Sequence, residues 1–271
     1  MIAKILADFS EALDSIVETD RNILIVVDYM IPLNVYPVSD DTTVFWVTTQ
    51  PEGDYNDIIK EHPECYSYLL TMFPELLELP NAHYFMGCTS FFEPNQFIEK
   101  EFGVSTVMSG RMNLPGHKLR REFFDRQDEV KVPLDFYLGT HNALPDDLYS
   151  KGIRLSAEKR DKIIAFNRMF HVTFGSYKRW GFFSEKIIDC FITKTVPIFW
   201  GCTNIGDYFN TDGIIIVDNV DEAIDACNSL TEQDYYDRRG AIHENFRHGL
   251  LWYSYEYQLN KTINTILDED T

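Results

Sequence analysis

Residues 181–202 read GFFSEKIIDCFITKTVPIFWGC, and the predicted fold depends on the pattern in this stretch. Gly181 allows a sharp turn of the backbone. The next residues have helical character and begin with the pair Glu185 and Lys186. The apolar run VPIFW (196–200) is typical of a buried strand. A helix that leads into a short buried strand predicts one repeat of a parallel α/β sheet.

The same alternation of short strands and helices extends through the rest of the chain. We expect strands over residues 21–29, 42–49, 66–72, 82–87, 103–110, 133–139, 170–176, 196–201 and 213–217. We expect helices over residues 3–17, 73–79, 116–127, 156–167, 184–193 and 221–230, and one or two long helices over 231–266. Ser156, Ser184 and Thr231 are the predicted N-caps. This order of elements predicts an α/β protein with a doubly wound parallel sheet.

The length of the chain favours two modest domains or one large domain. With 271 residues, of which 45% are apolar, the chain can build a sizeable core. The proline-containing stretch 92–103 is the best boundary, because no other stretch resembles a linker. We therefore predict an N-terminal α/β domain over residues 1–102 and a second domain over residues 103–271.

The charge balance restricts the classes of partner. The chain has 24 basic and 43 acidic residues, a net charge of −19. This field repels nucleic acid phosphates and anionic lipid, so we expect no nucleic acid partner. A small anion could bind only where basic side chains gather locally, which makes any such cluster informative.

The cysteines and the N-terminus indicate a protein of the cytoplasm. The five cysteines show no CxxC spacing, so we expect small buried fillers in a reducing compartment and no zinc site. The N-terminal residues contain no long apolar segment of a signal peptide. No stretch reaches about 18 consecutive apolar residues, so we also expect no membrane span.

Two predicted turns after strands are rich in basic residues. The first, 109–120, is followed directly by a further arginine, and the second is 175–186. Their basic side chains are Arg111, His117, Lys118, Arg120 and Arg121 in the first, and Lys178, Arg179 and Lys186 in the second. Ligands of parallel sheets bind beyond the carboxyl ends of the strands, so the two turns predict a diphosphate site. A solvated helix face and an ordinary surface ion pair remain open as alternatives.

Three common motifs are missing from the sequence, which narrows the function. There is no GxxxxGK[ST] loop of a P-loop ATPase and no GxGxxG after a strand, which disfavours a dinucleotide oxidoreductase. There is also no GxSxG nucleophile elbow.

The stretch FHVTFGSYKRWGFFSEKIIDCFITKTVPIFWGCTNIGDYF (170–209) resembles the donor-binding region of the α1,3/1,4-fucosyltransferase family. The family signature runs roughly F-x-hydrophobic-E-N, then G-Y-hydrophobic-T-E-K, a helix, and IP-aromatic-W-G. The matching positions are Phe170, Gly181, Glu185, Lys186, Ile187, Asp189, Pro197, Trp200 and Gly201. Segments 75–85 and 104–125 are similar as well, so the resemblance covers roughly residues 70–215.

The resemblance implies a fold and an activity. It implies two Rossmann-like domains that face each other, the GT-B arrangement, here with a reduced N-terminal domain on the acceptor side. The C-terminal domain would bind the nucleotide sugar. It further implies an inverting glycosyltransferase that transfers fucose from GDP-fucose to a glycan hydroxyl, with no catalytic metal and no other cofactor.

The resemblance also assigns roles to residues. Arg120 takes the role of the arginine at the phosphates, Lys186 that of the lysine near phosphate and fucose, and Glu185 that of the glutamate at the ribose. Arg120 and Lys186 would thereby stabilise the charge on the leaving diphosphate. Ser176 and Phe182 stand at two further donor-binding positions, in place of the family's Asn and Tyr.

Departures from the family pattern keep a second function open. The family's base carboxylate falls near residues 47–53, where Gln50 cannot accept a proton and Glu52 is the nearest candidate base. Gly175 and Ser176 replace the family's Glu-Asn. These changes suit a non-catalytic relative that binds a nucleotide sugar or a glycan. An unrelated α/β protein is a third alternative. The acceptor and the oligomeric state stay open.

Overall fold

A computed structural model of the chain describes residues 4–7, 22–27, 41–48, 55–94, 98–139, 144, 146–155 and 159–269. The chain forms two compact units. The first unit consists of Met1–Gly87 together with Tyr255–Thr271, and the second unit is Cys88–Ser254. Within the described ranges, every helix is too short or too polar to cross a lipid bilayer.

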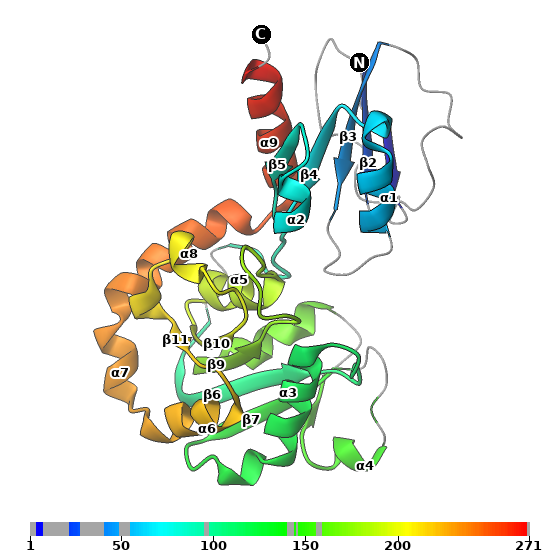
Figure 1. Ribbon diagram of the computed structural model, residues 1–271. Helices are drawn as coiled ribbons and strands as arrows, with labels where there is room; N and C mark the ends of the chain where they lie inside the picture. Colours follow the sequence, from blue (N-terminus) through cyan, green and yellow to red (C-terminus); the bar gives the residue numbers. More distant parts are fainter. Residues whose placement is uncertain are drawn as a thin grey trace. The chain divides into compact units, whose positions relative to one another are not determined.

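The first unit is built on a parallel sheet of five strands in sequence order (Figure 1). The strands are β1 (Lys4–Ala7), β2 (Asn22–Val27), β3 (Thr42–Val47), β4 (Tyr68–Thr71) and β5 (Ala82–Tyr84). The helical elements are α1 (Tyr55–Glu61), η2 (Pro63–Cys65), α2 (Pro74–Leu77) and α9 (Tyr255–Glu269). The chain therefore enters this unit twice, once at each end of the sequence.

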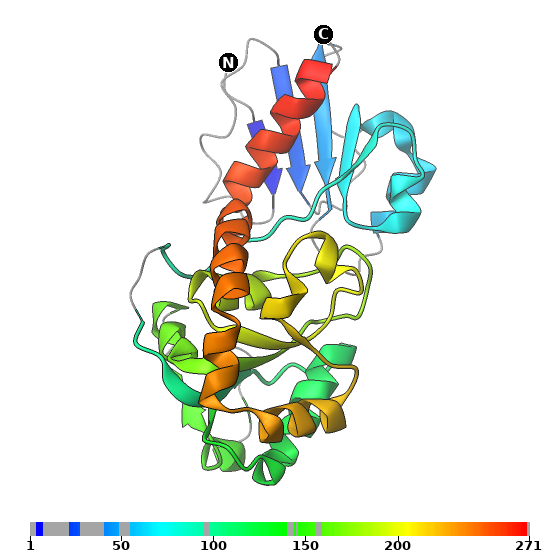
Figure 2. The same ribbon diagram turned by 90° about the vertical axis from the view of Figure 1, so that its left-hand side faces the viewer.

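Helix α9 covers one face of the first sheet, along which it runs in Figure 2. Its side chains Leu259, Ile263, Ile266 and Leu267 share one core cluster with alternate residues of three strands. Those strand residues are Ile23, Ile25, Phe45, Val47 and Leu70. Because every second side chain of a strand points to the same face, this set forms one continuous apolar surface for the helix.

The second unit is built on a parallel sheet of six strands with the order β11-β10-β9-β6-β7-β8 (Figure 1). The strands are β6 (Glu101–Met108), β7 (Leu134–Leu138), β8 (Ile153–Arg154), β9 (Arg168–Phe174), β10 (Val196–Trp200) and β11 (Ile215–Ile216). Successive strands run outward from β6 in one direction and outward from β9 in the other. This is the Rossmann strand order, and the β6–β9 pair is its topological switch point, where ligands bind.

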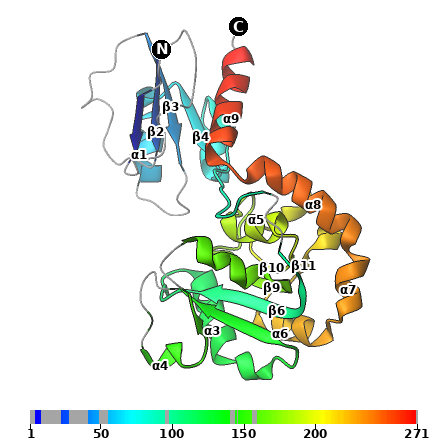
Figure 3. The same cartoon turned by 180° about the vertical axis from the view of Figure 1, so that it is seen from behind.

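Helices cover both faces of the second sheet (Figure 1 and Figure 3). They are α3 (Pro115–Asp125), α4 (Asp146–Tyr149), α5 (Glu185–Ile192), α6 (Val220–Ser229), α7 (Glu232–Asp237) and α8 (Arg239–Trp252). Short 3-10 helices are η3 (Gln127–Glu129), η4 (Lys159–Phe166), η5 (Ile205–Asp207) and η6 (Thr211–Gly213). Apolar side chains of α3 and α6 pack on one face of the sheet, while α5 lies on the other.

The predicted α/β class with parallel sheets is confirmed, and each predicted strand has a counterpart. The free Cys88, Cys190, Cys202 and Cys227 are buried as expected, and Cys65 is partly exposed. Thr231 caps α7 as predicted, because its side chain accepts a hydrogen bond from the amide of Asp234.

Three local predictions were wrong. Residues 4–7, expected to be helical, form β1 paired in parallel with Leu24–Val27, because pairing between strands overrides the weak helical pattern. The expected α-helix over 156–167 is the 3-10 helix η4, and Ser156 lies outside the described residues. Residues 231–266 form three helices rather than one or two long helices.

The compact units also differ from the predicted boundaries at 102 and 103. The second unit begins at Cys88, and residues 255–271 belong to the first unit. The C-terminal segment belongs to the first unit because the apolar face of α9 is buried on the first sheet. No linker composition marks this return of the chain, so no local pattern could have predicted it.

Candidate functional site

A cavity of about 450 Å³ opens in the second unit at the switch point of the sheet. Its walls come from the carboxyl ends of β6 and β9, the turns that follow them, the 3-10 helix η4 and the first turns of α5. The charged and polar lining residues are Ser109, Arg111, His117, Arg120, Lys162, His171, Thr173, Ser176, Glu185, Lys186 and Asp189. The cavity therefore stands where the strand order predicts a ligand crevice.

The two basic turns touch each other beside this cavity. The amide of Gly116, in the first turn of α3, donates a hydrogen bond of 3.1 Å to the carbonyl of Ser176. A Cβ atom at position 116 would lie 1.6 Å from the carbonyl oxygen of Gly175, so only glycine fits there. This close backbone approach brings the start of α3 against the turn after β9.

Arg120 extends from α3 to the end of β9. Its Nε and Nη2 donate hydrogen bonds of 3.0 and 2.6 Å to the carbonyl of Phe174, the last residue of the strand. Burial lowers the pKa of Arg120 to about 10, with a smaller lowering from Arg111, so the guanidinium stays charged at neutral pH. An arginine has five N–H donors, and this arrangement fixes the group while leaving others for a ligand in the cavity.

Glu185 and Lys186 lie in the first turn of α5. The turn into this helix needs Gly181, which has a φ of 67° and donates its amide to Asn204 Oδ1 at 2.7 Å. Ser184 occupies the N-cap position, as predicted, but its side chain makes no capping hydrogen bond. The amides of Ile187 and Ile188 donate to the carbonyl of Ser184, at 3.2 and 3.5 Å.

Glu185 and Lys186 form an ion pair with 2.6 Å between Oε1 and Nζ. Burial acts to raise the pKa of Glu185, but the ammonium and the hydrogen bond of Lys186, with Lys162 and Arg120, outweigh it and lower that pKa. Glu185 is therefore an ionised acceptor on the cavity wall.

The charge of the cavity is opposite to that of the chain. Four cationic side chains line it: Arg111, Arg120, Lys162 and Lys186. Burial is the main cause that lowers the pKa of His117 to about 4 and that of His171 to about 3, so both rings are neutral at pH 7. The cations exceed the two lining carboxyl groups, Glu185 and Asp189, in number. A protein of net charge −19 thus has a positive cavity.

Asp189 lies on α5 and is buried. Its Oδ1 accepts hydrogen bonds from Ser90 Oγ at 2.7 Å and from the amide of Phe91 at 3.0 Å. Burial raises the pKa of Asp189 to about 7, and the nearby Glu185 carboxylate raises it as well, against the lowering by these two hydrogen bonds and by Lys162. This carboxyl group therefore changes charge near neutral pH.

The structure brings Arg120, Ser176, Glu185 and Lys186 together on one cavity. Phe182 does not line it, since its ring is buried beside Tyr177 with the ring centroids 6.3 Å apart. Glu52 and Gln50 lie outside the described residues. Four basic residues of the two turns lie outside the cavity lining, namely Lys118, Arg121, Lys178 and Arg179. Lys118 is exposed, Arg121 pairs with Asp125 and Lys178 pairs with Asp218. The solvated-face alternative thus holds for part of the basic cluster.

Sequence reasoning missed Lys162 and His171 as cavity residues. Lys162 lies in the connection between β8 and β9. Local spacing does not predict which face of the sheet this connection covers, so it could not place Lys162 at the cavity. His171 was counted only as part of a strand. Its alternation with Phe170 and Val172, which face the core, is the signal that could have shown a polar side chain on the opposite face. Within the described ranges, no group of three or more His, Cys, Asp or Glu side chains could hold a metal ion.

No known protein-family model matches the chain. Among curated proteins, it is similar to the α-(1,3)-fucosyltransferase FucT of Helicobacter pylori, with 29% identity over 179 residues. The match covers 62% of this chain and 34% of the relative, so the chain spans about a third of that protein's length. The predicted resemblance to fucosyltransferases is confirmed.

Solved structures show the same fold. An α1,3-fucosyltransferase with GDP-fucose matches with a TM-score of 0.54 and 16% identity, covering 92% of this chain and 78% of that chain. A TarM variant from S. aureus, solved in complex with UDP, matches with a TM-score of 0.62 and 12% identity, covering 90% of this chain and 55% of that chain. At these identities the likeness shows the fold alone, which is that of GT-B glycosyltransferases.

Proposed function

We propose that this chain is an inverting glycosyltransferase that transfers fucose from GDP-fucose to a glycan hydroxyl. The observation that carries the proposal is the positive cavity at the switch point of the second sheet, in a protein of net charge −19. Such a cavity suits a pyrophosphate, which needs several cations close together. The similarity to an α-(1,3)-fucosyltransferase supports fucose as the sugar and guanosine diphosphate as its carrier.

In this proposal, four side chains bind the donor. Arg120 and Lys186 bind the pyrophosphate, because both are cations on the cavity wall. Glu185 accepts hydrogen bonds from the ribose hydroxyls, since its carboxylate is ionised and partly exposed. Ser176 supplies a hydroxyl group on the cavity wall, at the position where the family has Asn.

In this proposal, the reaction is a single displacement at the anomeric carbon. The acceptor oxygen attacks the anomeric carbon of the sugar while the bond from that carbon to the pyrophosphate oxygen breaks, so GDP leaves with the electron pair. The cations stabilise the charge that develops on GDP without a metal ion. The proton of the acceptor hydroxyl passes to a carboxylate base, for which Glu52 is our candidate.

A non-catalytic function is the second candidate. Gln50 stands where the family has its base, and Gly175 stands where the family has a glutamate. A Cβ atom at position 175 would lie 3.2 Å from the carbonyl oxygen of Trp200, so the backbone at this turn leaves little room for a larger side chain. A relative with this cavity would bind a nucleotide sugar or a glycan without transferring it.

The cysteines support a cytoplasmic location, because all five are free and a reducing compartment keeps thiols in that state. The acidic surface charge supports our proposal that the partners are small molecules and glycans rather than nucleic acid.

A panel of labelled nucleotide sugars and glycan acceptors tests the function, together with calorimetry of GDP binding. We expect GDP to bind and labelled fucose to appear in a glycan product. Binding of GDP with no transfer from any donor would favour the non-catalytic function. The absence of both would remove the glycosyltransferase proposal.

A further inference from the structure

The 3-10 helix η4 forms part of the cavity wall and contributes the cationic side chain of Lys162 to it. Lys162 and Phe166, both of η4, line the cavity together with Arg120 and Lys186. A single run of 3-10 helix is held weakly by its own hydrogen bonds, because their geometry is poor. The position of Lys162 therefore depends on what holds η4 to the sheet.

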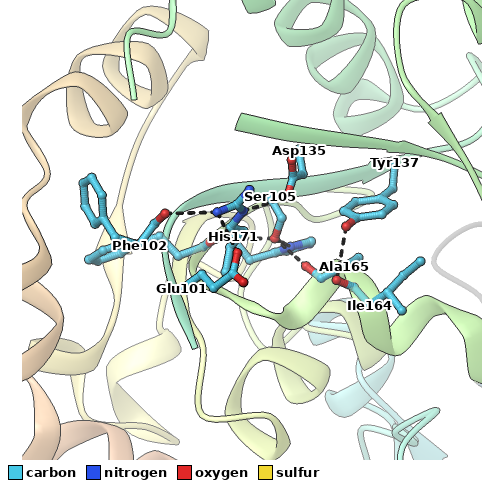
Figure 4. Close-up of polar contacts among 10 residues, drawn as sticks. Glu101, Phe102, Ser105, Asp135, Tyr137, Ile164, Ala165 and His171 are labelled. Carbon is cyan, nitrogen blue, oxygen red and sulfur yellow. Dashed lines mark hydrogen bonds and ion pairs between the residues drawn. The ribbon is translucent and has the colours of Figure 1, made fainter. Parts of the chain in front are cut away.

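Three consecutive carbonyl groups at the end of η4 accept hydrogen bonds from side chains of other elements. Tyr137 Oη on β7 donates to the carbonyl of Ile164 at 3.2 Å. Ser105 Oγ on β6 donates to the carbonyl of Ala165, and Lys100 Nζ donates to that of Phe166. The first two contacts are drawn in Figure 4. These bonds satisfy carbonyl groups that a helix end leaves without a partner inside the helix.

His171 on β9 makes two further contacts that hold the end of η4 to the sheet. Its Nδ1 lies 2.8 Å from Ser105 Oγ, as Figure 4 shows, and its ring stacks on that of Phe166 with 4.5 Å between the ring centroids. Ser105 and His171 are opposite each other in the register of β6 and β9, so the contact is set by the sheet. Four residues from three strands and the segment before β6 thus fix the end of η4.

Lys162 of η4 lies among the charged side chains that line the cavity. Its Nζ lies 4.4 Å from the centroid of the Phe91 ring. Phe91 donates its amide to Asp189, which also lines the cavity. Lys162 lines the same cavity as Glu185 and Asp189, and its charge contributes to lowering the pKa of both carboxyl groups. Arg120 and Lys186 are already committed to Phe174 and Glu185 through part of their donors.

We infer that Lys162 is a further donor-binding cation that contacts the pyrophosphate from η4, and that Tyr137 and Ser105 are positioning residues for it. The inference deepens the proposed function and rests on it. The cavity then holds the pyrophosphate between η4 on one side and the starts of α3 and α5 on the other. Lys162 raises the number of cations at the leaving group beyond the two that the sequence pattern assigns.

The test compares GDP and GMP binding by calorimetry for the wild type and for Lys162→Met, which keeps the aliphatic stem and removes the charge. We expect Lys162→Met to weaken GDP binding about 10- to 100-fold, the range for a lost hydrogen bond to a charged group. The preference for GDP over GMP should shrink as well, because the second phosphate loses a cation. An unchanged GDP affinity or an unchanged preference overturns the inference.

Lys194→Met is the matched control. Lys194 Nζ also lies over an aromatic ring, 4.8 Å from the centroid of Phe246, but it does not line the cavity. We expect its GDP affinity to stay within about twofold of the wild type. An equal loss in both variants would show a general effect of net charge and would overturn the inference.

The two proposals fail in different ways. A wild-type protein that binds neither GDP nor inorganic pyrophosphate contradicts the proposed function, and the role of Lys162 falls with it. A wild-type protein that binds GDP as tightly as Lys162→Met keeps the proposed function and removes the inference alone.

A double-mutant cycle tests the positioning role. Tyr137→Phe removes only the hydroxyl that donates to η4. We expect it to weaken GDP binding about three- to tenfold in the wild type and to have little effect in Lys162→Met, since coupled residues are not additive. Equal effects in the two backgrounds would overturn the positioning role, because a loss of general stability acts in both. Thermal unfolding confirms that each variant is folded.

Discussion

The two units share a parallel sheet and differ in how their strands use the two faces. In β3 of the first unit, Phe45 and Val47 point to α9 while Val44 and Trp46 point to the opposite face, and all four are buried and apolar. Trp46 is therefore a core residue. A strand that is apolar on both faces acts as scaffold.

In the second unit, β9 has one apolar and one polar face. Phe170, Val172 and Phe174 pack into the core with α3 and α6, whereas His171 and Thr173 lie on the opposite face, and residues of both faces line the cavity. The described strands of the first sheet keep sequence order, but the second sheet reverses direction between β6 and β9. The reversal of strand order between β6 and β9 and the polar face of β9 together create a ligand site in the second sheet, whereas the first sheet serves as scaffold.

The largest expected effect comes from Arg120→Met in the second unit. The variant removes the charge that the cavity holds at the end of β9. We expect fucose transfer to fall at least about 1,000-fold, at the upper end of what one lost charge-stabilising donor costs. The measurement is the initial rate of labelled fucose transfer from GDP-fucose. Arg121→Met on the same helix is the control, because that residue pairs with Asp125 away from the cavity. Equal rates in the two variants would contradict the assigned role.

The first unit should respond in stability instead. Ile263 on α9 is fully buried against the first sheet, so Ile263→Ala leaves a cavity and should lower the free energy of unfolding by about 3 kcal/mol. We expect GDP affinity to be unchanged where the variant is folded. Urea unfolding and calorimetry measure the two quantities. Asn264→Ala, an exposed neighbour, is the control. A large fall in GDP affinity would show that the two units are less independent than the comparison implies.

Lys186→Met separates the charge of the cavity from its shape. We expect GDP binding to weaken about 30-fold at pH 7, as for a lost charged hydrogen bond. Without the ammonium, burial prevails and the pKa of Glu185 rises. The loss of affinity on acidification should therefore begin at a higher pH than in the wild type, because ribose binding needs the ionised carboxylate. Calorimetry between pH 4 and 8 measures the shift. Lys178→Met, in the same turn and paired with Asp218, should keep the wild-type profile.

The smallest effect is expected for Asp189→Asn, which keeps the acceptor for Ser90 and Phe91. The folded pKa of about 7 lies above the ordinary value, so the native state holds a proton that the unfolded chain releases between about pH 4 and 7. Wild-type stability therefore falls as the pH rises through this window, and asparagine removes the fall. We expect the variant to be more stable at pH 8 by about 1–2 kcal/mol, below the limit of about 4 kcal/mol that the shift sets. The measurement is the free energy of unfolding of both proteins as a function of pH. If the difference between wild type and variant stayed constant from pH 4 to 8, this role of Asp189 would be contradicted.

Much of the second unit was predictable from local patterns. Short apolar runs separated by helical segments predicted its sheet, and the basic turns after two of the strands predicted the place of the cavity. Glu185 and Lys186 were found because a glycine and a helix start mark them. Four of the six proposed site residues do line the cavity, namely Arg120, Ser176, Glu185 and Lys186.

Other features were decided by contacts between distant segments. Phe182 was assigned by its position in a motif, but packing with Tyr177 keeps its ring away from the cavity lining. Lys162 comes to the cavity only because donors from β6, β7 and the segment before β6 fix the end of η4. No spacing within residues 156–167 encodes those donors.

Three features can be predicted from the amino-acid sequence alone: the alternation of strands and helices, the excess of negative charge, and the two turns in which positive charge gathers. These are local or summed properties, set by the periods of the strand and helix and by composition. Long-range contacts decide that helix α9 (Tyr255–Glu269) packs on the first sheet, that residues 4–7 form a strand, and that Lys162 and His171 line the cavity. Each of these depends on burial and hydrogen bonding between segments far apart in the chain, and such contacts exist only once the sheets have formed.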